Sequence, residues 1–89
     1  MSYRILLHPK AAEFLKKTKL DLRNRIKDAL KELENSPETK GQRLQHSRFL
    51  RLRIGDYRAI YMVSSEKHEV VVLYIGHRKE VYDDFTRLL

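Results

Sequence analysis

The sequence predicts an α+β domain: a small, mostly antiparallel four-stranded sheet with two N-terminal helices packed on one face and a short C-terminal helix (β-α-α-β-β-β-α). Three observations lead to this prediction. A short β-rich segment opens the chain, two segments with helical spacing of apolar residues follow, and the second half alternates apolar and polar residues around a turn signal. Helices and strands are thus grouped separately, as in α+β domains.

Length and composition restrict the classes of protein that need be considered. With 89 residues, the chain is expected to form a single domain over residues 1–89. A net charge of +7 favours an acidic partner, with nucleic acid first, an acidic protein second and an anionic membrane third. A soluble domain that is merely basic is the plain alternative. The chain has no cysteine, which excludes disulfides, thiolate metal sites and thiol nucleophiles.

The first residues carry no apolar signal region, and no stretch approaches the length of a membrane span. We therefore expect a cytoplasmic protein without a membrane partner. No two of the histidines His8, His46 and His68 show the spacing of a metal site, so neither a metal nor a cofactor is expected.

The first half of the chain predicts one strand and two helices. Residues 3–7 are β-rich and apolar on both sides, which is unlike a half-exposed edge strand. Pro9 suits the first turn of a helix, expected over 11–17. A longer helix is expected over 20–34, where apolar residues recur at helical spacing, and Pro37 follows its end. A polar connector then leads to the second half.

Residues 49–63 have the pattern of a β-hairpin. Gly55 and Asp56 between two alternating segments are a two-residue turn signal, because Gly accepts the positive φ that such turns need. A two-residue loop fixes the register, so Arg53 is expected directly opposite Arg58. One face of the first strand then carries the apolar side chains of Leu50, Leu52 and Ile54.

Three guanidinium groups are expected on the other face of this hairpin, from Arg51, Arg53 and Arg58. Directly opposed like charges destabilise a sheet unless something negative lies between them. The ordinary meaning of strand arginines is a solvated face. Their opposition across a tight turn instead favours a polyanion as the ligand.

The last strand is expected over 69–75, apolar on both faces as in the middle of a small sheet, and Gly76 ends it. A final helix is expected over 79–89.

Core packing is the favoured role of three strand tyrosines, Tyr57, Tyr61 and Tyr74.

A second motif follows the last strand, where Gly76-His77-Arg78 is followed by Val81-Tyr82. In order along the chain, the hairpin arginines, the Gly-Asp-Tyr-Arg turn, the Gly-x-Arg strand end and the Val-Tyr pair resemble the RelE branch of the RelE/ParE toxin superfamily. The resemblance spans nearly the whole chain, since one short strand followed by two helices also belongs to that fold.

The resemblance implies the toxin of a type II toxin–antitoxin system, an mRNA endonuclease that enters the ribosomal A site, inhibits translation and arrests growth. In this family the substrate's own 2′-OH attacks the adjacent phosphate without a metal. The implied partners are mRNA, the ribosome and a cognate RelB-like antitoxin. The residues matched to the family's catalytic set are Arg53, Arg58, Arg78 and Tyr82. The residues assigned to contacts with RNA phosphates are Arg51, His77 and Lys79.

The chemistry of phosphodiester cleavage suits these residue types. Attack builds negative charge on the equatorial oxygens, which preorganised cations stabilise, and the planar fork of arginine binds phosphate bidentately. Tyr82 would take or orient the 2′-OH proton, with its pKa lowered by surrounding cations. His77 is a further acid–base candidate, because histidine is the side chain that most readily exchanges a proton under physiological conditions. Arg51 stands where well-known relatives have lysine, and Arg78 and Tyr82 lie closer in sequence than in some members.

Two alternatives stay open. A ParE-like member of the superfamily would poison DNA gyrase, although such members lack the combined arginine and tyrosine set. A non-catalytic RNA-binding module would hold phosphates with the same arginines and cut nothing, because catalysis depends on placement to about an ångström.

Overall fold

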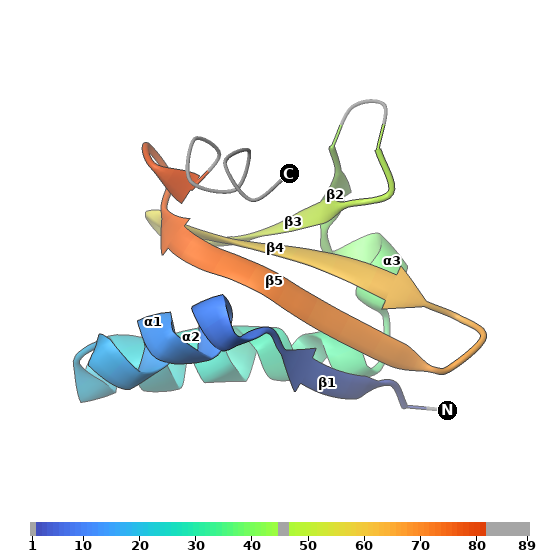
Figure 1. Cartoon of the computed structure of the whole chain (residues 1–89), viewed down its shortest axis with the longest axis horizontal. Helices are drawn as coiled ribbons and strands as arrows, with labels where there is room; N and C mark the ends of the chain where they lie inside the picture. The colour runs from blue at the N-terminus through green and yellow to red at the C-terminus, as the bar shows by residue number, and fades with distance from the viewer. Residues whose placement is uncertain (1, 45–46, 82–89) are drawn as a thin grey trace.

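The computed structural model of the chain describes residues 2–44 and 47–81. Its elements follow one another as β1 (Arg4–Leu7), α1 (Pro9–Lys17), α2 (Leu20–Lys31), the 3₁₀ helix η1 (Glu32–Glu34), α3 (Pro37–Lys40), β2 (Gln42–Arg43), β3 (Leu50–Ile54), β4 (Tyr57–Ser64) and β5 (Glu69–His77) (Figure 1). Pro9 occupies the first position of α1, as its fixed φ favours, and the His8 side chain caps the helix by accepting a hydrogen bond from the Lys10 N–H.

The sheet has five strands in the order β1-β5-β4-β3-β2, not the four that the sequence predicts. The additional strand, β2, is a two-residue segment of the polar connector that pairs antiparallel with β3. All neighbours are antiparallel except β1 and β5, which are parallel and are joined through the rest of the chain. A two-residue strand has no detectable alternation, so sequence pattern could not reveal it.

The prediction that the opening strand is covered on both sides is wrong. β1 is an edge strand, and Leu6 and Leu7 are 36% and 39% exposed. Ile5 packs partly against the main core. An apolar strand composition indicates β structure, but it does not say whether a second layer covers both of its faces.

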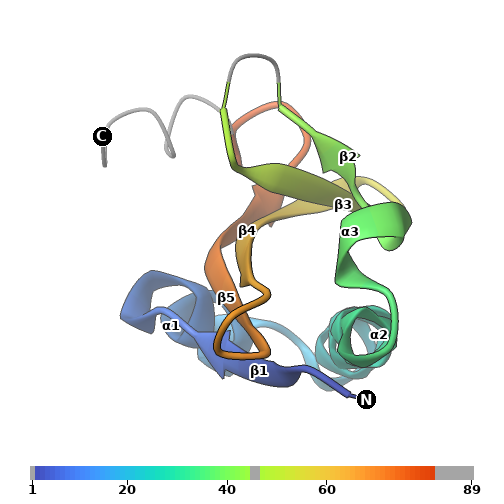
Figure 2. The same cartoon turned by 90° about the vertical axis from the view of Figure 1, so that its right-hand side faces the viewer.

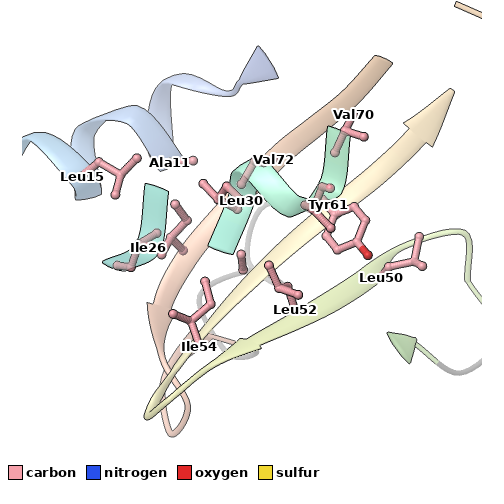
Figure 3. Packing of buried hydrophobic residues seen from close by; sticks show 13 residues of the cluster. Ala11, Leu15, Ile26, Leu30, Leu50, Leu52, Ile54, Tyr61, Val70 and Val72 are labelled. Atoms are coloured by element: carbon pink, nitrogen blue, oxygen red, sulfur yellow. The ribbon is translucent and has the colours of Figure 1, made fainter. Parts of the chain in front are cut away.

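The helices α1 and α2 contribute to one core on one face of the sheet (Figures 1 and 2). Figure 2 views α2 nearly along its axis, with α3 and β3 above it. Apolar residues at helical spacing in both helices point toward the sheet, as shown in Figure 3. The fully or nearly buried residues of the two helices are Ala11, Leu15, Ile26 and Leu30, and those of the sheet are Leu50, Leu52, Ile54, Ala59, Tyr61, Val70, Val72 and Ile75.

A β-bulge in β5 changes which residues face the helices. Ile60 pairs with Tyr74 but the next residue, Tyr61, pairs with Val72, so Leu73 is an extra residue on β5. An extra residue reverses the alternation of side chains along a strand. Leu73 and Tyr74 consequently both pack with a small cluster around Ile60 and Val81, on the face opposite the helices.

The end of the chain differs in part from the prediction. β5 does not end at Gly76 but continues to His77, and residues 78–80 form a turn, so the first helical residue is Val81 rather than Lys79. The remainder of the predicted C-terminal helix falls on residues 82–89, which lie outside the described residues. In the part of the chain that the structure covers, no helix combines the length and apolar character needed to cross a membrane.

Candidate functional site

The hairpin between β3 and β4 has the register that its turn predicts. Gly55 takes φ +60°, and Ile54 pairs with Tyr57 across the two-residue loop. Arg53 and Arg58 are the next pair, directly opposed on the face that does not carry the helices. The predicted like-charge pair is therefore present in the fold.

Three arginines line one groove with the segment that joins α3 to β2. We call this cavity of about 330 Å³ the arginine groove, and it is lined by Lys40, Gly41, Gln42, Arg51, Arg53 and Arg58. Four of its six lining residues are cations. Because the walls come from β2, β3, β4 and the end of α3, paired strands and a helix end hold the charges together.

Neutral oxygen atoms accept the hydrogen bonds that orient two of these guanidinium groups. The Gln42 Oε1 atom accepts from Arg51 Nε at 3.2 Å and from Arg51 Nη2 at 2.6 Å. Arg58 Nη1 donates to the backbone carbonyls of Gly55 and Tyr57, each at 2.8 Å. Within residues 2–44 and 47–81, no carboxylate forms a salt bridge with Arg53 or Arg58. The hydrogen bonds that orient Arg58 thus leave its positive charge in place, as an anion site requires.

Arg78 lies beside the hairpin turn but does not line the arginine groove. Its backbone N–H donates to the carbonyl of Asp56 at 2.8 Å, which ties the end of β5 to the tip of the hairpin. Its side chain is exposed. Opposite Arg58, β5 presents Gly76, so no side chain from that strand occupies the position next to the Arg58 guanidinium. Tyr82, the predicted proton acceptor, lies outside the described residues.

His77 lies on the helix side of the sheet, away from the three hairpin arginines. It pairs with Tyr57, and the two rings meet edge to face with centroids 5.6 Å apart. The His77 Nδ1 atom accepts a hydrogen bond from the Lys79 backbone N–H at 3.2 Å, and Lys79 is exposed in the turn. His77 lines a different cavity, of about 670 Å³, together with Phe14 and other residues of the helices. The structure therefore does not bring His77 into the arginine groove.

Two polar residues of the groove, Lys40 and Gln42, were not among the predicted site residues. Both come from the polar connector, where the sequence shows no alternation and no motif. Their placement depends on the pairing of β2 with β3, which puts Gln42 directly opposite Arg51. Among the described residues, no three His, Asp or Glu side chains come together as metal ligands would.

Comparisons with protein families and with solved structures agree with each other. A sequence model of the family described as "ParE toxin of type II toxin-antitoxin system, parDE" matches residues 5–82. A mutant of the E. coli toxin RelE in the free state is 29% identical, with 100% of each chain covered and a TM-score of 0.77. No curated protein sequence matched significantly.

Toxins solved together with their antitoxins are also similar. In the archaeal RelE–RelB complex from Pyrococcus horikoshii, the matching chain is 25% identical, with 88% of this chain and 97% of that chain covered and a TM-score of 0.76. In the intact E. coli RelBE complex the identity is 26%, the coverage is 85% and 96%, and the TM-score is 0.75. With this fold and a family match over most of its length, the chain belongs to the RelE/ParE family of toxins of type II toxin–antitoxin systems.

Proposed function

We propose that this toxin is a ribosome-dependent mRNA endonuclease that cuts mRNA in the A site and so inhibits translation. The observation that supports this proposal is the arginine groove. Three guanidinium groups from one hairpin face a common cavity, and the acceptors that orient Arg58 are backbone carbonyls rather than carboxylates. A phosphodiester is the natural occupant of such a site, because arginine matches its geometry and charge.

The proposed reaction needs no metal ion and no cofactor. The 2′-OH of one nucleotide attacks the adjacent phosphorus, and the bond from phosphorus to the next 5′-oxygen breaks. The 2′-OH loses its proton and the leaving 5′-oxygen gains one, so the products are a 2′,3′-cyclic phosphate and a free 5′-OH. Arg53 and Arg58 would stabilise the charge on the equatorial oxygens, and each such donor is worth roughly 10²–10³-fold in rate.

The remaining predicted residues have secondary roles in this scheme. Arg78, beside the hairpin tip, would stabilise charge on the leaving 5′-oxygen, because a guanidinium gives up a proton too reluctantly to act as an acid. Tyr82 would take or orient the 2′-OH proton, as the family resemblance implies. Arg51 and Lys79 would contact RNA phosphates. A contact of His77 with RNA would have to involve a part of the ligand beyond the groove.

The test is cleavage on programmed ribosomes. Purified protein is incubated with ribosomes stalled on a defined mRNA, and the 5′-OH ends are mapped. We expect cuts within the A-site codon that are absent with the Arg53→Ala/Arg58→Ala double variant and absent from the same mRNA without ribosomes. Binding to the ribosome without new 5′-OH ends would instead indicate a non-catalytic RNA-binding module.

Inhibition of DNA gyrase is the second candidate function, because the matching family model is described as ParE toxin. A supercoiling assay discriminates between the two. Inhibition of supercoiling by the wild-type protein, together with intact mRNA on ribosomes, would replace the endonuclease proposal with this one. The arginine groove favours RNA as the ligand. A surface that binds a protein target has no need of several cations gathered in one groove and oriented by neutral hydrogen-bond acceptors.

The partner that silences the toxin would be a cognate antitoxin, by analogy with the RelB proteins in the solved complexes. With a net charge of +7, the toxin favours an antitoxin segment that is acidic or amphipathic and lies across the basic face or the helices. Expression with and without the product of the neighbouring gene, scored by growth, tests this. Growth arrest that the neighbour does not relieve would count against that gene as the antitoxin.

A further inference from the structure

The arginine groove has one wall that does not come from the β3–β4 hairpin. Lys40, Gly41 and Gln42 line it, at the junction of α3 and β2. Lys40 is the last residue of α3 and is exposed, and Gln42 is the first residue of β2. A short helix and a two-residue strand have little stability of their own, so the position of this wall depends on what anchors it to the sheet.

Tyr61 is the anchor. Its ring is completely buried on the helix side of β4, and its hydroxyl donates to the carbonyl of Pro37 at 2.6 Å. Burial raises the pKa of the Tyr61 phenol to about 12, so the hydroxyl remains a neutral donor at physiological pH. A Cβ atom at Gly41 would lie 2.1 Å from the Tyr61 oxygen and 2.7 Å from the Arg51 carbonyl oxygen. The wall is thus held tightly against both β3 and β4.

Gln42 connects this wall to Arg51. The two residues are cross-strand partners, and the Gln42 Oε1 atom accepts from two nitrogen atoms of the Arg51 guanidinium. An amide oxygen is a neutral acceptor, so this contact orients the guanidinium plane without itself neutralising the charge. A glutamate in the same place would give the same geometry and cancel that charge.

We propose that Lys40 is a fourth phosphate-binding cation of the groove, and that Gln42 is a positioning residue that orients Arg51 toward the RNA backbone. This inference rests on the proposed function, because it takes RNA as the ligand. Lysine binds phosphate as a compact point charge, and Lys40 lies on the wall outside the hairpin, so we assign it to a phosphate flanking the scissile one. Lys40 would therefore act in binding, and the arginines in both binding and chemistry.

The first experiment measures RNA affinity against salt concentration. The probe is a fluorescently labelled single-stranded RNA whose 2′-hydroxyls are methylated, so that it cannot be cut. Each phosphate contact on a single strand contributes about 0.7 to the slope of log affinity against log salt. We expect Lys40→Gln to lower the slope by about 0.7. The matched control, Lys16→Gln, removes the same charge from an exposed position on α1, on the other face of the sheet, and should leave the slope unchanged.

A second series tests Gln42 with two variants that have different effects on the Arg51 guanidinium. Gln42→Glu keeps a hydrogen-bond acceptor for Arg51 but offsets the positive charge of its guanidinium. Gln42→Ala removes this acceptor and leaves the guanidinium charge unchanged. If Gln42 positions Arg51 for phosphate, the Ala variant, which adds no charge to the groove, binds RNA more weakly than wild type and has the lower salt slope. If Gln42 is only structural, the folded Ala variant keeps wild-type affinity and slope, whereas the negative charge of Glu weakens binding in either case. Thermal unfolding of both variants shows that each is folded.

The outcomes separate this inference from the proposed function. Wild-type protein that neither binds the RNA nor cuts mRNA on ribosomes would overturn the proposed function itself. Wild-type protein that binds, with Lys40→Gln and Lys16→Gln giving the same slope, would overturn the role of Lys40 alone. A folded Gln42→Ala variant with wild-type affinity and salt slope would overturn the role of Gln42.

Discussion

Arg53 and Arg58 are direct partners across the hairpin, on adjacent strands and on the same face of the sheet. Like charges placed directly opposite each other destabilise a sheet. Arg58 donates to the carbonyls of Gly55 and Tyr57, which orient it but do not neutralise its charge. The free protein therefore maintains an arrangement that costs stability, and a phosphate between the two guanidinium groups would reverse the sign of that interaction.

Replacing Arg53 with alanine should separate stability from activity. Removal of the like-charge pair should raise the free energy of unfolding by roughly 0.2–1 kcal/mol, and more at low salt than at high salt. Cleavage on ribosomes should fall roughly 10²–10³-fold, since one cation at the phosphate is lost. Urea unfolding at two salt concentrations and single-turnover cleavage measure the two effects. A variant that is less stable but cuts normally would show that the opposed pair serves the fold instead.

Arg78 should prove important for cleavage and unimportant for stability. The bond that joins the end of β5 to Asp56 uses the backbone N–H of Arg78, so Arg78→Ala retains it. The side chain is exposed, and surface substitutions of this kind usually change stability by less than about 0.5 kcal/mol. We expect unchanged thermal unfolding, loss of growth arrest with alanine and partial recovery with lysine, which keeps the charge but not the bidentate fork. Full toxicity of Arg78→Ala in cells would remove Arg78 from the mechanism.

The hairpin and its arginines could be predicted from sequence because both depend on local rules. A two-residue turn fixes register, and alternation fixes the faces, so the opposition of Arg53 and Arg58 follows from a few adjacent residues. The two helices likewise follow from their apolar spacing. The edge position of β1 and its parallel pairing with β5 depend on contacts between distant segments, which no local pattern records.

The face on which His77 lies depends on a single irregularity in the pairing of β4 and β5. Counting alternate residues from Val72, which faces the helices, places His77 on the opposite face, with the arginines. The extra residue Leu73 reverses this alternation, so Ile75 and His77 face the helices and Gly76 lies beside Arg58. Nothing in the apolar run of β5 marks the bulge. The wall made by Lys40 and Gln42 escaped prediction for a related reason, since its place depends on tertiary anchoring by Tyr61.

The Tyr61 hydroxyl should give the protein a distinct alkaline sensitivity. Its pKa is raised by burial to about 12, whereas in the unfolded chain tyrosine ionises near 10. The folded state therefore holds the proton that the unfolded state releases, and this contribution to stability is complete below pH 10 and is lost as pH rises toward 12.

The corresponding measurement is the difference in unfolding free energy between wild type and Tyr61→Phe. Near neutral pH the variant should be less stable by about 1–3 kcal/mol, because the Pro37 carbonyl loses its buried donor. Between pH 10 and 12 the difference should shrink by about 1.4 kcal/mol per pH unit. Because other titrating groups are common to both proteins, they cancel in the difference. A difference that stays constant with pH would mean that Tyr61 is not protected from ionisation.

Two glycines offer a matched test of how rigidly the groove wall is held. A Cβ atom at Gly41 would lie 2.1 Å from the Tyr61 oxygen and 2.7 Å from the Arg51 carbonyl oxygen, so Gly41→Ala must displace either the anchor or the β3 backbone. At Gly76, the nearest atoms to an added Cβ lie at 3.5 Å, an ordinary contact. Overpacking typically costs about 1–3 kcal/mol, so Gly41→Ala should lower stability by that amount, while Gly76→Ala should be close to neutral.

The Gly41 variant should also weaken RNA binding, because the displaced wall carries Lys40 and the acceptor for Arg51. Thermal unfolding gives the stability of both variants, and binding of the methylated RNA gives the state of the groove at a temperature where each remains folded. Folded Gly41→Ala protein with wild-type RNA affinity and salt slope would show that the wall has moved without consequence. The arginines of the hairpin would then suffice for the site, and the wall formed by Lys40, Gly41 and Gln42 would have no part in holding phosphate.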